Sequence, residues 1–339
     1  MKRFFIFIVI ASLLIIVISC KKENSSDTEI KYDWFPIDYQ LPVGKIDMSD
    51  SPMKIYYINE KTGFISSVTE RNNEPIFVMT NDSSKTFQDL SSQVEGLVLD
   101  IDFSSEDCGL LFTMSEFNRF LYKTVDGGKN WQLIQDQNFK NIYTIQTPKD
   151  GTFLILSFSG NDSRIMYSSD YGENWSDRIN FYGNTVLGGK FQFLGNGQDT
   201  GFVYITDTIF TTFDSGFTWD KYTSIECAPL EFYQFADYNT LYIHCLDKFF
   251  KSDDLGLTFK YLSDFQVRKW QLISEDEQYI LKAVQTYNTS DEFMTINLMN
   301  IETVSDDKYE KYILDFMFIK PGIGYAISPT GLIYKTRKK

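Results

Sequence analysis

Five aspartates have the most regular spacing among the residues whose side chains could do chemistry. Each follows a serine or threonine by two residues and precedes a tryptophan or phenylalanine by five. Carboxylates can act as general acids or bases, and clusters of them bind Ca²⁺. The aspartates Asp82, Asp126, Asp170, Asp214 and Asp254 are separated by 44, 44, 44 and 40 residues. This period indicates a repeated structural unit, which would distribute the carboxylates around the molecule, so we predict a structural role for them.

Three arginines form a second candidate site. Arg71, Arg119 and Arg164 fall between the second and third predicted strands of consecutive repeats. On neighbouring loops of an acidic protein, three guanidinium groups could hold an anionic ligand such as a carboxylate. The competing interpretation, which we favour, is that they are solvated or pair with nearby carboxylates such as Glu70 and Glu116.

Cysteine and histidine are too sparse for a zinc site. The only histidine is His244, and none of the cysteines has metal-ligand spacing. Cys227 and Cys245 are a possible disulfide. Together with Cys108 they make an odd number of cysteines, so at least one of the three thiols has no intramolecular partner. We also find no G-x-S-x-G elbow and no glycine-rich phosphate loop, so we expect no catalytic nucleophile, metal or cofactor.

The amino terminus has the pattern of an export signal. Lys2 and Arg3 precede an apolar run from Phe4 to Ile18, which is shorter than the ~20 residues of a membrane-spanning helix. The V-I-S-C sequence ending at Cys20 resembles the lipobox of bacterial lipoproteins. This resemblance implies cleavage before Cys20, acylation (palmitate) of that cysteine and a lipid anchor in the bacterial cell envelope, and Lys21 favours the outer membrane. We assign residues 1–19 to the signal peptide, 20–32 to the lipidated cysteine and a polar tether, and 33–339 to one folded domain.

The charge of the chain argues against nucleic acid as a partner. The formal net charge is −14, with 46 acidic and 32 basic side chains. Loss of Lys2 and Arg3 with the signal peptide would make it more negative still. Such a field repels phosphate backbones. We expect a monomer attached to the membrane through its lipid.

The elements that must position these residues are short β-strands. Three strand-like segments precede each aspartate motif, as in Val98–Phe103, Leu110–Thr113 and Phe120–Thr124, and a fourth begins at the motif's aromatic residue. Two further repeats without the motif follow, and Trp34–Ile37 matches the missing last strand of the final repeat. We predict an all-β fold, a single seven-bladed β-propeller of four-stranded antiparallel blades, closed by an N-terminal strand.

The five motifs resemble the Asp boxes, or BNR repeats, of sialidases, sortilin-type receptors and photosystem II assembly factor-like propellers. The segment Gly322–Thr336 is similar to the repeat of the last family. The resemblance implies that the boxes lie at the periphery, between the third and fourth strands. Their aspartates and the aromatic residues, Trp131, Trp175 and Trp219 among them, would then stabilise the hairpins.

Two functions remain open on the sequence. The first is a membrane-anchored, non-enzymatic propeller that binds a protein partner or a glycan through its loop face. The alternative is a glycoside hydrolase or sialidase-like enzyme acting on extracellular polysaccharide. The F-R-I-P sequence of sialidases is absent, so we favour the first function.

Overall fold

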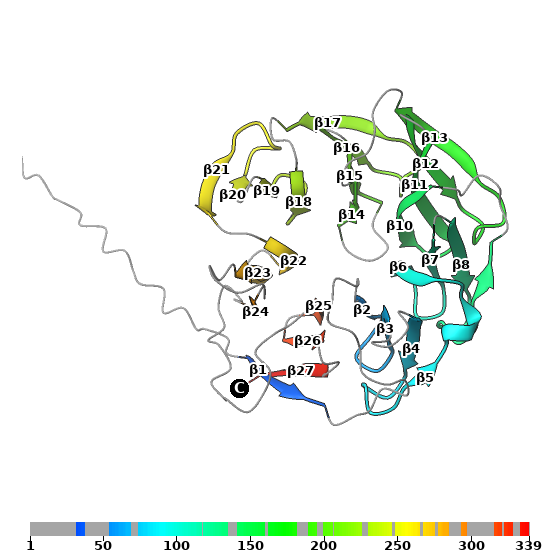
Figure 1. Cartoon of the computed structure of the whole chain (residues 1–339). Coiled ribbons are helices and arrows are strands. Elements are labelled where there is room, and N and C mark those ends of the chain that lie inside the picture. Colours follow the sequence, from blue (N-terminus) through cyan, green and yellow to red (C-terminus); the bar gives the residue numbers. More distant parts are fainter. Residues whose placement is uncertain are drawn as a thin grey trace, which may run out of the picture.

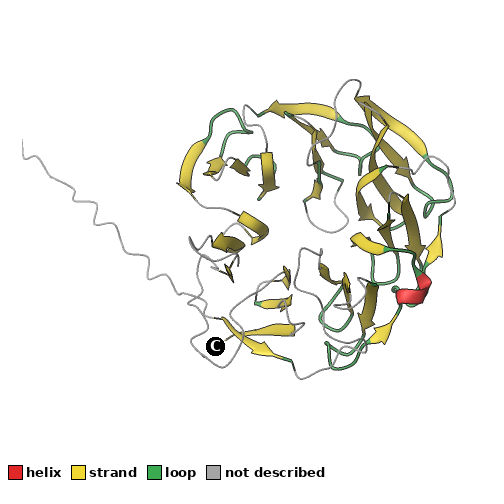
Figure 2. Cartoon of the chain, in the orientation of Figure 1, coloured by secondary structure: helices red, strands yellow, loops and turns green. Residues whose placement is uncertain are grey.

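The computed structural model describes seventeen segments of the chain. They are residues 32–37, 54–68, 74–116, 118–134, 141–159, 162–181, 189–194, 199–205, 207–225, 230–245, 248–264, 267–274, 277–284, 293–296, 315–320, 322–327 and 333–338. Nearly all of their regular structure is β-strand, with one 3₁₀ turn, η1 (Ser91–Gln93) (Figure 2). The strands form antiparallel sheets arranged around a common axis, which is a β-propeller (Figure 1).

Six sheets have four strands each. We number five of them as blades 1 to 5 in chain order and call the sixth the closing blade. Blade 1 contains β2 (Lys54–Tyr57), β3 (Gly63–Val68), β4 (Pro75–Thr80) and β5 (Gln88–Asp89), and blade 2 contains β6 (Leu97–Phe103), β7 (Gly109–Ser115), β8 (Asn118–Thr124) and β9 (Gln132–Leu133). Blade 3 contains β10 (Ile142–Lys149), β11 (Thr152–Ser159), β12 (Asp162–Ser168) and β13 (Ser176–Phe181), and blade 4 contains β14 (Phe191–Phe193), β15 (Gly201–Ile205), β16 (Thr208–Thr212) and β17 (Asp220–Ser224). Blade 5 contains β18 (Leu230–Phe235), β19 (Leu241–Cys245), β20 (Lys248–Ser252) and β21 (Lys260–Asp264).

The closing blade joins the two ends of the described chain. Its strands are β25 (Asp315–Lys320), β26 (Ile323–Ile327), β27 (Ile333–Lys338) and, on the outside, β1 (Tyr32–Pro36). Trp34 pairs with Thr336 in the antiparallel ladder, and the Ile37 N–H donates to the Ile333 carbonyl at 2.8 Å. The predicted closure by an N-terminal strand is therefore confirmed, although the strand begins at Tyr32, inside the segment predicted as tether.

The predicted number of seven four-stranded blades is wrong for the described residues, which form six. The repeat predicted as the sixth forms a three-stranded sheet of β22 (Val267–Ser274), β23 (Glu277–Val284) and β24 (Phe293–Ile296). The sequence that follows β24 carries no box, the motif that precedes the fourth strand in blades 1 to 5. Residues 297–314 lie outside the described part of the chain.

The hydrophobic core is divided among the interfaces between neighbouring blades. One cluster combines Leu154 and Ile165 of blade 3 with Phe191, Val203 and Trp219 of blade 4. The second strands are sandwiched between blades, and every residue of β3 is buried. The aromatic residue of a box precedes the fourth strand of its own blade, which begins at the interface with the preceding blade. The aromatic ring therefore packs against the preceding blade.

Candidate functional site

Side chains on five innermost strands bond to the backbone of the next sheet around the axis. On β14, Gln192 Oε1 accepts from the Phe235 N–H at 2.7 Å, and Gln192 Nε2 donates to the Phe235 carbonyl at 2.9 Å. Gln271 makes the same pair of bonds to Phe318 at 2.8 and 2.7 Å. We call this set the inter-blade ring: Tyr56, Asp102, Gln192, Gln271 and Met317, which accept from the N–H groups of Phe103, Thr147, Phe235, Phe318 and Tyr57.

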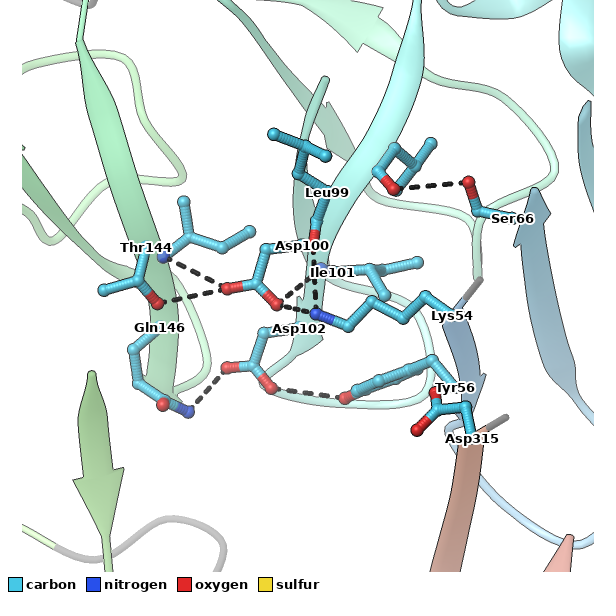
Figure 3. A network of polar contacts seen from close by, with 12 residues as sticks. Lys54, Tyr56, Ser66, Leu99, Asp100, Ile101, Asp102, Thr144, Gln146 and Asp315 are labelled. Carbon is cyan, nitrogen blue, oxygen red and sulfur yellow. Dashed lines mark hydrogen bonds and ion pairs between the residues drawn. The ribbon is translucent and has the colours of Figure 1, made fainter. Parts of the chain in front are cut away.

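A second row of polar side chains lies on the innermost strands β2, β6, β10 and β25, two residues before Tyr56, Asp102, Gln146 and Met317 and therefore on the same face as these residues (Figure 3). Lys54 on β2 forms an ion pair with Asp100 on β6 and donates to the Leu99 carbonyl at 3.2 Å. The Thr144 hydroxyl on β10 donates to Asp100 Oδ2 at 3.1 Å. On β25, Asp315 Oδ2 accepts from the Ile55 N–H at 2.8 Å.

A cavity of about 550 Å³ lies at the carboxyl-terminal ends of the innermost strands. Each box turn is hydrogen-bonded to the turn that joins the first and second strands of its own blade, as in Gly127 N–H to the Asp107 carbonyl at 2.9 Å. The cavity therefore opens on the same face of the propeller as the boxes. It is lined by Tyr56, Tyr57, Ile58, Asp102, Phe103, Ser104, Ser105, Glu106, Gln146, Thr147, Pro148, Phe193, Gln271, Met317, Phe318 and Ile319.

Asp102 is one of two carboxylates in the lining of the cavity, and it lies between Gln146 and Tyr56 (Figure 3). Its Oδ2 accepts from Gln146 Nε2 at 2.6 Å and from the N–H and hydroxyl of Thr147 at 2.6 and 2.7 Å. Its Oδ1 accepts from the Tyr56 hydroxyl at 3.2 Å. Burial raises the pKa of Asp102 to about 6, although the Thr147 hydrogen bonds oppose this shift. Burial, with Asp102 next in importance, also raises the pKa of Tyr56 well above its ordinary value, so the phenol remains the donor.

The raised pKa of Asp102 predicts a particular dependence of stability on pH. The folded state holds the proton more tightly than the unfolded state, so this contribution is present in full below about pH 4 and is lost as pH rises through 6. A shift of this size corresponds to a change on the order of 3 kcal/mol. We expect the difference in melting temperature between the wild type and Asp102→Asn to be several degrees more favourable to the wild type at pH 4 than at pH 7.

The control for this experiment is Asp220→Asn, which makes the same chemical change at an exposed position of β17. Its curve of melting temperature against pH should keep the wild-type shape. Parallel curves for the wild type and Asp102→Asn between pH 4 and 7 would contradict the assignment of the titration to Asp102.

The predicted box aspartates are all in turns. In blade 3, Asp170 Oδ1 accepts from the Ser168 hydroxyl and the Asn174 N–H at 2.8 and 2.9 Å, and Oδ2 accepts from the Asn174 amide at 2.7 Å. The other four boxes repeat these bonds to the hydroxyl two residues before and to the residue four positions later, at Asp82, Asp126, Asp214 and Asp254. Hydrogen bonds donated by Thr86 and Asn174 lower the pKa of Asp82 and Asp170 to about 2.

The box tryptophans lie at the interfaces between sheets. Trp131 and Trp219 are buried, and Trp175 is half-buried against the cluster that joins blades 2 and 3. The Trp219 and Trp175 indoles donate to the carbonyls of Gly216 and Gly172 in their own boxes, at 3.0 and 2.9 Å. The box tryptophans are therefore packing groups, and none of these three lines the cavity.

Two of the three candidate arginines, Arg119 and Arg164, contact different residues. Arg164, at the start of β12, forms an ion pair with Asp177 at 3.3 Å, and its Nε donates to the Ser157 hydroxyl. The guanidinium of Arg119, at the start of β8, lies 5.6 Å from the ring centre of Phe158. Both stand at the end of their strands opposite to the boxes and the cavity. Arg71 lies outside the described residues, so the three-arginine site stays a prediction.

The cysteines differ in state. Cys108 is a buried free thiol, and burial raises its pKa. Cys245 is disulfide-bonded, and its partner lies outside the described residues, as do Cys227 and Cys20. The described part of the chain contains no cluster of three or more His, Cys, Asp or Glu residues that could hold a metal ion. Within the same residues, no helix is long and apolar enough to cross a membrane.

The cavity residues were missed by the sequence analysis, although a signal for them exists. Three of them, Tyr56, Asp102 and Gln146, occupy equivalent positions of consecutive first strands. The next two first strands have Gln192 and Gln234 at the same position, so four of the five side chains are amides or carboxylates. A polar residue that recurs at one position of consecutive first strands predicts a shared structural or binding role.

The chain is thus a β-propeller with a polar axial cavity. No family model and no curated protein matches it. Among solved structures, it is similar to "YCF48 bound to D1 peptide", with a TM-score of 0.61 and 13% identity over 91% of this chain and 95% of that chain. YCF48 from Cyanidioschyzon merolae gives a TM-score of 0.59 and 12% identity over 90% and 98% of the two chains. The WD40 propeller domain of Doa1 gives a TM-score of 0.51 and 11% identity over 89% and 98%. The resemblance to photosystem II assembly factor-like propellers is confirmed at the level of the fold.

Proposed function

We propose that this chain is a lipid-anchored envelope protein that binds a protein partner without catalysing a reaction. The observation that carries the proposal is the axial cavity, whose size falls within the ~300–1,000 Å³ of small binding pockets. YCF48, which shares the fold, has a solved structure bound to a D1 peptide. We therefore propose a peptide segment of the partner as the occupant of the cavity.

The lining of the cavity suits a peptide segment. Aromatic and aliphatic side chains such as Phe193 and Ile319 supply apolar contact, and Gln146, Gln271 and Ser105 place amides and a hydroxyl among them. Because these groups come from several sheets that are bonded by the inter-blade ring, they form a preorganised site. Preorganisation lowers the entropic cost of binding.

We further propose that the five motifs are true BNR repeats. In the same proposal, Cys227 is the disulfide partner of Cys245, and Cys20 carries the lipid in the outer membrane. The lipid attaches the propeller to the envelope.

Peptide binding in the cavity is tested by display selection against the purified full chain. An enriched peptide is then measured by calorimetry on the wild type, on Ser105→Trp, which fills the cavity, and on Ser224→Trp, which adds the same ring on the exposed face of β17. We expect Ser105→Trp to weaken binding at least tenfold and Ser224→Trp to leave it unchanged. Failure of the selection to enrich any peptide, or equal binding by all three proteins, would refute the proposed function.

The anchor gives a second expected result. Cys20→Ala should abolish incorporation of labelled palmitate and move the protein from the membrane to the soluble fraction, since acyl chains contribute ~0.8 kcal/mol per buried methylene. Cys108→Ala, which removes a thiol from the buried core, is the matched control and should leave both readouts unchanged. Retention of Cys20→Ala in the membrane would rule out lipidation at that residue as the anchor.

A further inference from the structure

The cavity holds negative charge that no basic side chain of its lining balances. Its lining includes the carboxylates of Asp102 and Glu106 and contains no lysine, arginine or histidine. The neighbouring carboxylate differs in this respect, because Asp100 has Lys54 as its cation. The hydrogen bonds that Asp102 accepts all come from uncharged donors on Tyr56, Gln146 and Thr147.

The two oxygens of Asp102 are unequal. Oδ2 accepts three hydrogen bonds, of 2.6 to 2.7 Å, which use its acceptor capacity. Oδ1 accepts the single, longer bond of 3.2 Å from Tyr56. Since Asp102 lines the cavity, Oδ1 is the atom with capacity for a further donor, and a charged N–H donor would form the strongest hydrogen bond there.

Aromatic and aliphatic groups surround this carboxylate. The rings of Tyr56 and Phe103 are stacked with centres 5.9 Å apart, and both residues line the cavity. Aromatic faces attract ammonium and guanidinium groups. Ile58 and Ile319 supply apolar surface for a methylene stem. At the box-face turn after β6, Glu106 Oε1 accepts from Asn59 Nδ2 at 2.9 Å and adds a second negative charge.

We propose that the cavity binds one organic cation, the ammonium or guanidinium group of a lysine or arginine side chain of the partner, with its N–H groups at Asp102 Oδ1. This proposal rests on the proposed function and names the chemistry of the segment that enters the cavity. The methylene stem of such a side chain matches the apolar lining, and the charged head matches the carboxylate that lacks a cation in the lining. The acidic character of the whole chain, with a net charge of −14, attracts the same partner.

Binding of the cation is coupled to the proton on Asp102. The cation favours the ionised carboxylate, so binding requires release of the proton that Asp102 holds below about pH 6. At pH 5 most of the carboxyl groups are protonated, and the apparent affinity should be about tenfold lower than at pH 7.5. This dependence is measured on the wild type and needs no variant.

The test uses calorimetry on the full chain in detergent with blocked amino acids as probes. N-acetyl-lysine N-methylamide and N-acetyl-arginine N-methylamide carry the cation, and the norleucine and citrulline counterparts are neutral matches. We expect millimolar binding of the two cationic probes and at least fivefold weaker binding of the neutral ones. Asp102→Asn should lose the preference for the cation, while Asp220→Asn should keep it.

Three outcomes would overturn the proposal. These are equal affinity for lysine and norleucine probes, an unchanged cation preference in Asp102→Asn, and equal affinity of the wild type at pH 5 and 7.5. If spermidine bound more tightly than either blocked residue, the claim that the cation belongs to a lysine or arginine side chain would be refuted. A display-selected peptide that Ser105→Trp weakens but Asp102→Asn does not would leave the proposed function intact and refute only the cation.

Discussion

Replacement of Trp131 by alanine is expected to lower the free energy of unfolding by about 3 to 5 kcal/mol. The indole is 8% exposed and lies against Phe64 and Phe77 of blade 1 and Phe103 of blade 2, with ring centres 6.1, 6.0 and 5.9 Å away. Truncation removes this contact and leaves a cavity between two sheets whose backbones are fixed by their ladders. Urea unfolding followed by circular dichroism measures the loss as a lower midpoint.

Two controls separate packing from other effects. Phe213→Ala removes an aromatic ring from the box of blade 4, but this ring is 55% exposed, so the loss should stay below about 1 kcal/mol. Trp131 Nε1 has no hydrogen-bond partner among the described residues, whereas Trp219 Nε1 donates to Gly216. Trp131→Phe should therefore lower the free energy of unfolding by about 1 kcal/mol less than Trp219→Phe does. A loss in Trp131→Ala no larger than that in Phe213→Ala would show that the interface packing is unimportant.

Gly128→Ala should destabilise the protein by about 2 to 4 kcal/mol, from strain and overpacking together. Gly128 has a φ of +80°, which L residues rarely adopt. A Cβ at this position would lie 2.4 Å from the Phe64 ring and 3.3 Å from Trp131. Because Phe64 is buried in the interface between blades 1 and 2, it has no free space into which to move. The same unfolding assay measures the effect.

The neighbouring Gly127 provides the matched control. Its φ of +75° is also positive, but a Cβ there would come no closer than 3.1 Å to the Glu106 carbonyl oxygen. Equivalent positions in other boxes hold Tyr171 and Ser215 at φ values of 60° and 58°. Gly127→Ala should therefore cost about 1 kcal/mol or less. Equal losses in the two variants would contradict the role assigned to the Phe64 contact.

Local sequence determined the parts of the fold that were predicted. The side-chain hydrogen bonds within each box join residues at most four positions apart, such as Asp170 and Asn174, so the pattern is visible in a short window. The closing strand was predictable because Asp33–Ile37 repeats the sequence that follows a box. The number of complete blades was not, because a repeat without a box leaves its fourth strand unmarked.

The cavity depends on contacts that no short window contains. Asp102 bonds to Gln146 and Thr147, which lie 44 and 45 residues later, and to Tyr56, 46 residues earlier. The arginines were chosen for their loops, yet the cavity opens at the other end of the strands. Asp102 was hidden among 46 carboxylates, and its burial, which distinguishes it, is a property of the assembled ring.

The pairing of β1 with β27 imposes an order on the production of this molecule. Ribosomes make β1 first and β27 last, so the first of the described strands waits for its partner while the blades between them are translated. Blades 1 to 5 are each made of strands consecutive in sequence and can form as they emerge. Ring closure is therefore the last step, and a chain truncated before β27 leaves β1 without its ladder, exposed to proteases and to pairing with other chains.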